Sequence, residues 1–152
     1  MQAYCGTVRQ DIPRGKCAAV SWLLASHTKS RAHRVLIVED SRHAGDRLTL
    51  FFARMGYSVC KVRSAGDAVA LCDHFPPDVA VVDVSGLDGT GYELARYIRE
   101  KRAKAVLIVA TGEQGFKPDA ERSQRVGIDH HFEKTADLDM LLTFVDKRRP
   151  AS

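Results

Sequence analysis

Polar side chains of complementary types follow four apolar runs in this sequence: Glu39, Asp40, Asp83, Thr111 and Lys134. Carboxylates that converge on one place repel each other unless protons or a cation relieve the repulsion. A hard divalent cation does this well, since Mg²⁺ binds one or two carboxylates together with waters and a substrate phosphate. An amine and a hydroxyl beside such a cluster favour the chemistry of phosphoryl transfer.

Each of these residues has a role that its chemistry allows. Asp83 is the candidate nucleophile, because a carboxylate can accept a phosphoryl group as an acyl phosphate. Asp40, helped by Glu39, would hold the cation, while Lys134 would pair with the attached phosphoryl group and Thr111 would donate a hydrogen bond to it. Catalysis of this kind depends mostly on positioning and on neutralising charge.

Taken singly, the same residues have ordinary structural explanations. Acidic residues suit the start of a helix, which would account for Glu39 and Asp40. Asp83 precedes a glycine-rich stretch and alone would be a turn residue. Lys134 alone would be a solvated lysine. Their joint occurrence at the ends of four apolar runs favours the functional explanation.

The elements that must position these residues alternate along the chain. Apolar, β-branched runs predict strands over 35–38, 57–62, 78–83, 105–111 and 127–134. Helical spacing and caps predict helices from Ser41 to Gly56 and over 64–75, 89–102, 114–126 and 135–149. This alternation predicts a parallel sheet with helices on both faces. In such sheets ligands bind at the carboxyl ends of the strands, where the polar residues converge.

The first helix also predicts its own core face. Leu48, Phe51, Phe52 and Met55 fall on one side at helical spacing, so we expect all four to pack against the sheet.

At these positions the chain resembles the receiver domain of bacterial two-component response regulators. The resemblance covers about 34–147 and rests on four segments in order: VLIVEDS (35–41), DVSGLDGTGYE (83–93), LIVATG (107–112) and GIDHHFEK (127–134). It implies a flavodoxin-like (βα)5 doubly wound parallel sheet with strand order 2-1-3-4-5. It also implies a stand-alone receiver domain over 34–149. Residues 1–33 before it show no clean period, and we expect an extension that is flexible or forms a short helix around Trp22.

The resemblance assigns further roles. It implies that Asp83 is phosphorylated in a Mg²⁺-dependent reaction by a sensor histidine kinase or a histidine phosphotransfer protein. The backbone carbonyl of Ser85 would complete the metal site. Thr111 and His131 would form the switch, although the family usually has Tyr or Phe where this chain has His131. Ser85 and Glu113, two residues after Asp83 and Thr111, would influence the access of hydrolytic water.

The expected output is protein–protein interaction in a phosphorelay rather than classical enzyme catalysis. The resemblance implies a downstream protein target and allows a homodimer through the face formed by 114–126, 127–134 and 135–149. One alternative is a receiver-like interaction module that is never phosphorylated. Another is a Mg²⁺-dependent hydrolase, but such enzymes usually need a second Asp where this chain has Ser85. A flavodoxin-like cofactor binder would need a phosphate loop after the first strand, which is missing.

Composition narrows the possible partners. The 152 residues carry a net charge of +4, but the basic excess lies in residues 1–34, and the rest of the chain is close to neutral. We therefore expect no direct DNA binding.

No apolar run approaches the ~20 residues of a membrane-spanning helix. The four cysteines form no CxxC pair, so a reduced, cytoplasmic protein is expected.

Overall fold

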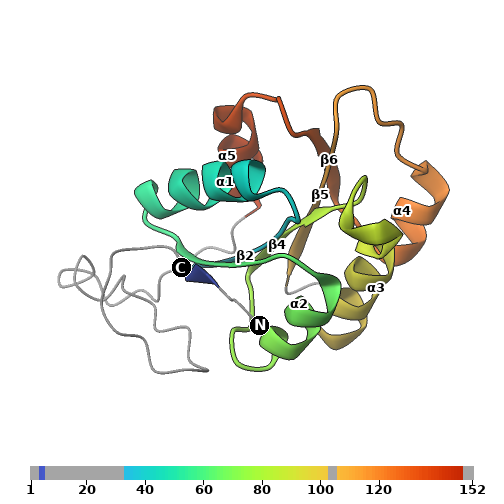
Figure 1. Cartoon of the computed structure of the whole chain (residues 1–152), viewed down its shortest axis with the longest axis horizontal. Helices are drawn as coiled ribbons and strands as arrows, with labels where there is room; N and C mark the ends of the chain where they lie inside the picture. The colour runs from blue at the N-terminus through green and yellow to red at the C-terminus, as the bar shows by residue number, and fades with distance from the viewer. Residues whose placement is uncertain (1–3, 6–32, 103–105, 149–152) are drawn as a thin grey trace.

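A six-stranded sheet forms the centre of the computed structural model, which describes residues 4–5, 33–102 and 106–148 (Figure 1). Its strands are β1 (Tyr4–Cys5), β2 (Arg34–Val38), β3 (Ser58–Val62), β4 (Val79–Asp83), β5 (Leu107–Gly112) and β6 (His130–Glu133). The strand order is β1-β3-β2-β4-β5-β6, and the last five strands run parallel. Without β1 this is the predicted order 2-1-3-4-5, so the predicted fold is confirmed.

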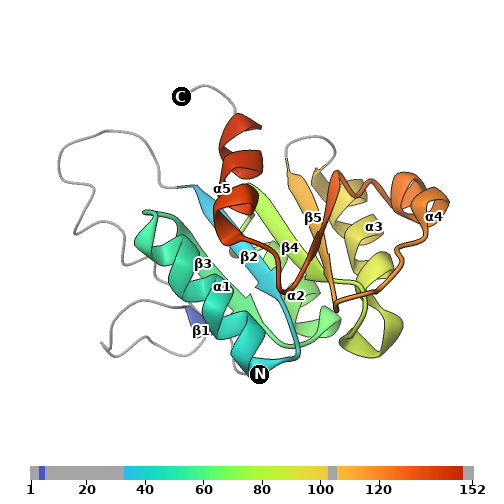
Figure 2. The same ribbon diagram turned by 90° about the horizontal axis from the view of Figure 1, so that it is seen from above.

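Helices cover both faces of the sheet (Figures 1 and 2). They are α1 (Arg42–Arg54), α2 (Ala65–Cys72), α3 (Gly91–Arg102), α4 (Ala120–Val126) and α5 (Leu138–Lys147), with a 3₁₀ turn, η2 (Leu87–Gly89), before α3. α1 and α5 pack on one face, and α2, α3 and α4 pack on the other. Ser41 and Ser64 cap α1 and α2 through their side chains, as their positions in the sequence predicted.

The central strands are apolar throughout because each contributes to two cores. In β2, Val35 and Ile37 face the core beneath α1 and α5, whereas Leu36 and Val38 face the core beneath α2, α3 and α4. Alternate residues of a strand point to opposite faces, so a strand covered on both sides needs apolar residues at every position. In β2 and β4 this leaves polar residues only at the ends of the strands.

The strand β1 was not expected from the sequence. It pairs antiparallel with β3 at the edge of the sheet, with Tyr4 opposite Lys61 and Cys5 opposite Cys60. Two residues carry too little periodicity to predict a strand. The short helix suggested around Trp22 lies outside the described residues.

Two predictions about the helices were wrong. The helix expected over 114–126 begins only at Ala120, because Gly115 has a φ of +79° and Pro118 disfavours helical geometry in the residue before it. Asp119 then caps α4 by accepting a hydrogen bond from the Arg122 amide. Met55 does not join the core face of α1: it follows the last helical residue and is 48% exposed.

Within the part of the chain that the structure describes, no helix combines the length and the apolar character that spanning a membrane would require.

Candidate functional site

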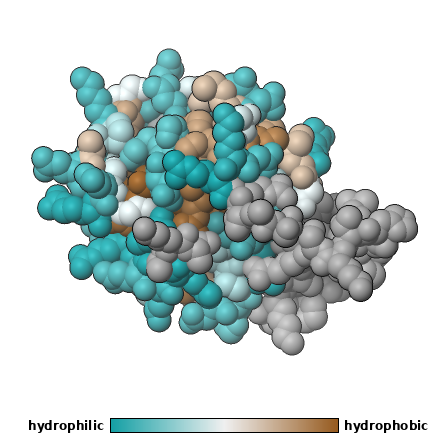
Figure 3. Space-filling model, turned by 180° about the vertical axis from the view of Figure 1, so that it is seen from behind, coloured by the Kyte–Doolittle hydropathy of each residue, from teal (hydrophilic) through white to brown (hydrophobic). Residues whose placement is uncertain are grey.

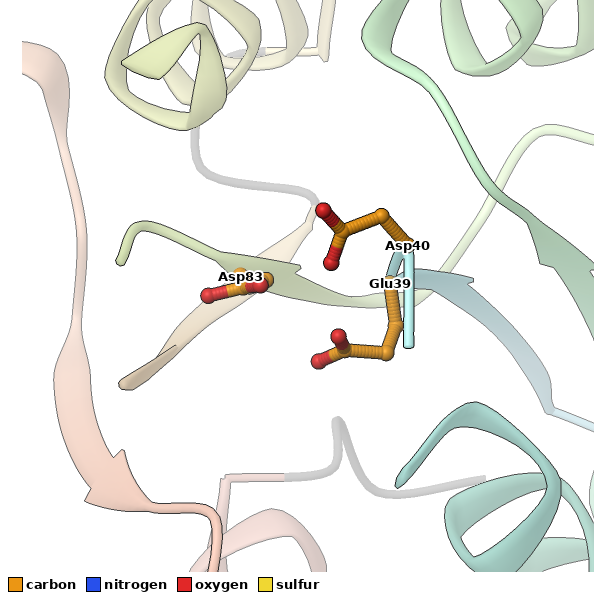
Figure 4. A group of neighbouring side chains, drawn as sticks. All are labelled: Glu39, Asp40 and Asp83. Atoms are coloured by element: carbon orange, nitrogen blue, oxygen red, sulfur yellow. The ribbon is translucent and has the colours of Figure 1, made fainter. Parts of the chain in front are cut away.

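Three carboxylates meet at the carboxyl ends of β2 and β4 (Figure 4). Val38 pairs with Val82 in neighbouring parallel strands, so the residues that follow them emerge side by side. One oxygen from each of Glu39, Asp40 and Asp83 lies within 4.8 Å of the others. Glu39 and Asp83 are buried and Asp40 is exposed, so the cluster opens towards solvent at Asp40. The convergence expected from the sequence is present.

Lys134 connects the end of β6 to this cluster. Its Nζ lies 2.9 Å from Asp83 Oδ2 and 3.0 Å from Glu39 Oε1. A third hydrogen bond of 3.0 Å reaches Glu113 Oε1. Burial opposes the positive charge of Lys134, but these carboxylates outweigh burial and raise its pKa above the usual value. Lys134 therefore stays protonated.

The other oxygen of Asp83 is held by the loop that follows β4. Oδ1 accepts hydrogen bonds from the Ser85 amide at 2.9 Å, the Ser85 hydroxyl at 2.9 Å and the Gly86 amide at 3.0 Å. Burial alone would raise the pKa of Asp83. The Lys134 ammonium and the donors of this loop outweigh burial, so the pKa of Asp83 lies below its usual value. Asp83 is thus an ionised carboxylate of fixed orientation.

Glycine is required at two positions around Asp83. A Cβ on Gly86 would collide with Asp83 Oδ2 and would lie 3.0 Å from Asp40 Oδ1. A Cβ on Gly91 would collide with the backbone carbonyl of Asp83. The approach to the carboxylate is therefore kept open by the absence of side chains.

Glu39 behaves differently from Asp83 although it is equally buried. Burial is the main cause of a pKa raised from 4.5 to about 7, and the neighbouring charge of Asp83 adds to it. Hydrogen bonds from Lys134 and from the Ser41 amide oppose this rise without cancelling it. Oε2 of Glu39 is buried without a hydrogen-bond partner among the described residues. A buried carboxylate oxygen that lacks a donor is an available ligand for a cation.

The donor set fits a hard divalent ion. All three residues offer carboxylate oxygens, the ligand type that Mg²⁺ prefers, and two of them are held within the same pocket as a fixed ammonium. The exposed side of Asp40 leaves room for water ligands and for an incoming phosphate.

Asp40 is also held by two contacts that the sequence did not predict. The Arg63 guanidinium donates to the Asp40 carbonyl oxygen at 3.0 and 3.2 Å. The Leu87 amide lies 3.4 Å from Asp40 Oδ2. Arg63 follows β3, and nothing in a lone arginine after a strand signals this contact.

Thr111 lies in β5 directly opposite Asp83 of β4. Its side chain is buried, and Oγ1 has no hydrogen-bond partner among the described residues. A buried hydroxyl without a partner costs free energy, about 1–3 kcal/mol. Thr111 can therefore gain a hydrogen bond if an acceptor arrives beside Asp83.

His131 lies in β6 and is bound to α4. Its Nε2 lies 2.8 Å from the Ser123 hydroxyl oxygen, and that hydroxyl donates its single proton to the Asp119 carbonyl at 2.6 Å. Nε2 of His131 must then carry the proton and donate it to Ser123, which fixes the tautomer. Burial, together with the neighbouring His130, lowers the pKa of His131. Ser123 was not singled out from the sequence.

Ser85 and Glu113 flank the site as their spacing suggested. The Glu113 amide donates to the Ser85 hydroxyl oxygen at 3.0 Å, and Glu113 Oε1 accepts from Lys134. The Glu113 side chain remains 68% exposed. Both residues lie at the boundary between the buried carboxylates and solvent.

A buried lysine beside the site was missed by the sequence analysis. Lys61 is the last residue but one of β3, is buried, and pairs with Asp46 of α1. A Cβ on Gly45 would lie 2.8 Å from Lys61 Cδ and 3.6 Å from Glu39 Cβ. The aliphatic parts of the Lys61 and Glu39 side chains therefore both lie against Gly45 of α1, where only glycine leaves space for them. A lone lysine among apolar strand residues was the one available signal.

The fold and the residues of the site can be compared with those of known protein families. Residues 35–146 match the family model of the response regulator receiver domain, and the chain belongs to that family. Receiver domains are the signalling domains of two-component systems.

Individual relatives agree with this assignment. The protein PilH of Pseudomonas aeruginosa is 31% identical over 116 residues, which cover 74% of this chain and 94% of PilH. The photosynthetic apparatus regulatory protein RegA of Rhodovulum sulfidophilum is 32% identical over 68% of this chain, and the match spans 56% of RegA. The crystal structure of the chemotaxis protein CheY4 of Vibrio cholerae has a TM-score of 0.71 at 21% identity, covering 78% of this chain and all of CheY4. CheY4 therefore shares the fold.

Proposed function

We propose that Asp83 accepts a phosphoryl group from a phosphohistidine of a sensor histidine kinase or a histidine phosphotransfer protein. The observation that carries this proposal is the state of Asp83: an ionised carboxylate, held by the loop after β4 and by Lys134, beside two further acids. A Mg²⁺-dependent reaction is proposed with it.

The chain's own residues account for the chemistry. A carboxylate oxygen of Asp83 would bond to phosphorus while the bond from phosphorus to the donor's imidazole nitrogen breaks, and that nitrogen keeps the electron pair. Lys134 already lies against Asp83 Oδ2, so its ammonium would neutralise the charge on the transferred phosphoryl oxygens. Thr111 would donate its unused hydroxyl to the same oxygens.

Glu39, Asp40, Asp83 and the backbone carbonyl of Ser85 would hold Mg²⁺. The ion would supply charge neutralisation to a phosphoryl group that approaches three acidic side chains. The unpaired buried Oε2 of Glu39 supports this role.

The proposed output is a change at the face formed by α4, β6 and α5. A hydrogen bond from Thr111 to the phosphoryl group would change the contacts of β5. The hydrogen bond between His131 of β6 and Ser123 of α4 would then be either kept or broken, and these are the two states of the proposed switch. A downstream protein or a second copy of this chain would bind that face, where Met140 of α5 is 64% exposed.

Phosphorylation by a small phosphodonor tests the proposal. The protein is incubated with Mg²⁺ and labelled phosphoramidate, and we expect an acid-stable, alkali-labile label that disappears in Asp83→Asn. Asp88→Asn is the matched control, because Asp88 is an exposed acid of the same loop.

Two outcomes would contradict it. Equal labelling of Asp83→Asn would remove Asp83 as the acceptor. Absence of any label would favour a receiver-like module that acts without phosphorylation.

A further inference from the structure

An arginine-rich groove lies between α3 and α4, outside the phosphorylation site. The two helices lie side by side in both ribbon views (Figures 1 and 2). The groove has a volume of about 600 Å³, within the range of binding sites for small ligands and peptide segments. Four arginines line it: Arg96, Arg99, Arg122 and Arg125.

The charge of this groove differs from that of its surroundings. Its four arginines exceed the two glutamates that also line it, Glu93 and Glu100, by two positive charges. The described residues as a whole contain 16 Lys and Arg against 18 Asp and Glu. The groove is therefore positive although the described residues as a whole carry a net charge of −2.

The four arginines differ in how far they are already engaged. Arg99 is only 20% exposed and donates to the carbonyls of Gly127 and Val106, so its role is structural. Arg122 pairs with Glu93 and stacks on the Tyr92 ring, 4.4 Å from the centroid. This stacking holds the guanidinium in place at the groove wall.

Two arginines are more available. Arg96 pairs with Glu100 at 2.9 Å, but both side chains are mostly exposed, and exposed pairs contribute little to stability. Arg125 is exposed and makes no hydrogen bond or ion pair within the part of the chain that the structure describes. An incoming carboxylate could bind Arg125 and could replace Glu100 at Arg96 at small cost.

We propose that this groove binds an acidic segment of a partner protein, with carboxylates on Arg96, Arg122 and Arg125. Charge is the recognition principle, because Tyr92 and Val126 are its only hydrophobic lining residues. The face of the molecule seen from behind is mostly hydrophilic, with smaller apolar patches (Figure 3). A dense polyanion such as nucleic acid fits less well, since Glu93 and Glu100 would repel consecutive phosphates.

The position of the groove gives such binding a consequence. α3 follows the loop of Asp83, and α4 lies in the segment after Thr111. The Tyr92 hydroxyl already joins them, by accepting from the Asp119 amide at 3.2 Å. A segment bound to both walls would restrain α4, which also holds His131 through Ser123. The binding itself does not depend on phosphorylation of Asp83.

Fluorescence anisotropy with a short fluorescein-labelled polyglutamate peptide tests the groove, using the full chain at low salt. We expect the double variant Arg96→Glu/Arg125→Glu to bind roughly tenfold or more weakly, a change of about 1.4 kcal/mol. The matched control is Arg54→Glu/Lys147→Glu, which makes the same charge change at exposed positions of α1 and α5. This control and Asp83→Asn should bind as the unmodified protein does.

Three results would overturn the proposal. The first is an absence of peptide binding by the unmodified chain. The second is an equal effect of the two double variants, which would assign any binding to general charge or to the basic residues before residue 35. The third is tighter, groove-dependent binding of a single-stranded oligonucleotide of the same charge, which would make the partner a nucleic acid.

Discussion

At the scale of single residues, the two buried acids of the site differ in what burial does to them. Asp83 receives three donors on one oxygen and Lys134 on the other, and these contacts hold its pKa low. Glu39 shares Lys134 but leaves Oε2 without a donor, and burial raises its pKa to about 7. Asp83, the proposed nucleophile, is therefore charged at neutral pH, whereas Glu39 changes its protonation near neutral pH.

The raised pKa of Glu39 predicts how stability depends on pH when no divalent ion is present. Between about pH 4.5 and pH 7 the folded protein binds a proton at Glu39 that the unfolded chain does not. The free energy of unfolding should therefore fall as pH rises through this window, by at most about 3 kcal/mol. Asp83 works in the opposite direction but loses its contribution only as pH falls below the usual range of carboxylates.

Urea unfolding in EDTA at several pH values measures this effect. Glu39→Gln should flatten the decline, because glutamine keeps the shape and cannot ionise. Glu121→Gln, an exposed glutamate of α4, is the control and should leave the curve unchanged. A decline of the same size in Glu39→Gln would assign it to another group.

At the scale of elements, a hydrogen bond between His131 and Ser123 connects β6 to α4. His131 donates to Ser123, whose own proton goes to Asp119 at the start of α4. His131 is thereby bound to α4, a helix of seven residues that follows the loop 113–119. Movement of α4 and reorientation of His131 must then occur together.

Removing the Ser123 hydroxyl tests this contact by spectroscopy. We expect the imidazole nitrogen shifts of His131 to show the Nε2–H tautomer alone, and Ser123→Ala to move them toward the mixed tautomers of a free histidine, at a cost of about 1 kcal/mol in stability. Thr143→Ala on α5, which removes an exposed hydroxyl bound to a backbone carbonyl, is the control and should leave His131 unchanged. The Nδ1–H tautomer in the unmodified protein would contradict the assignment.

The sequence predicted those elements whose residues carry a repeating pattern. Val35–Val38 and 79–82 are continuous aliphatic runs, which predict central strands, and the polar residues after them converge at the predicted edge, whereas the strand order was predicted from the family resemblance. It could not predict contacts made by isolated residues across the fold. Lys61, Arg63 and Ser123 have ordinary local surroundings, and their partners lie 15, 23 and 8 positions away.

At the scale of the whole molecule, the three carboxylates and Lys134 connect elements from the two ends of the domain. Glu39 and Asp40 follow β2, Asp83 ends β4, and Lys134 follows β6. A ligand that needs all of these residues in place binds only the folded protein, and it therefore stabilises the folded state.

Mg²⁺ should therefore raise the free energy of unfolding. At about ten times its dissociation constant the increase is about 1.4 kcal/mol, and it should vanish in Asp40→Asn. Asp88→Asn should keep the full response, and a monovalent salt of equal ionic strength should not reproduce it. Thermal unfolding with increasing Mg²⁺ measures the effect, and stabilisation retained in Asp40→Asn would show that the ion binds elsewhere.

The Ser85 hydroxyl has one proton and uses it on Asp83, while its oxygen receives the amide of Glu113. The Ser85 hydroxyl thus connects the end of β4 to the beginning of the loop 113–119 through two hydrogen bonds. When Asp83 loses its full negative charge, Asp83 attracts the Ser85 proton less strongly. The Ser85 hydroxyl is then less polarised, and its oxygen becomes a poorer acceptor for the Glu113 amide. A change of charge on Asp83 would then weaken the hydrogen bond that holds the start of the loop 113–119.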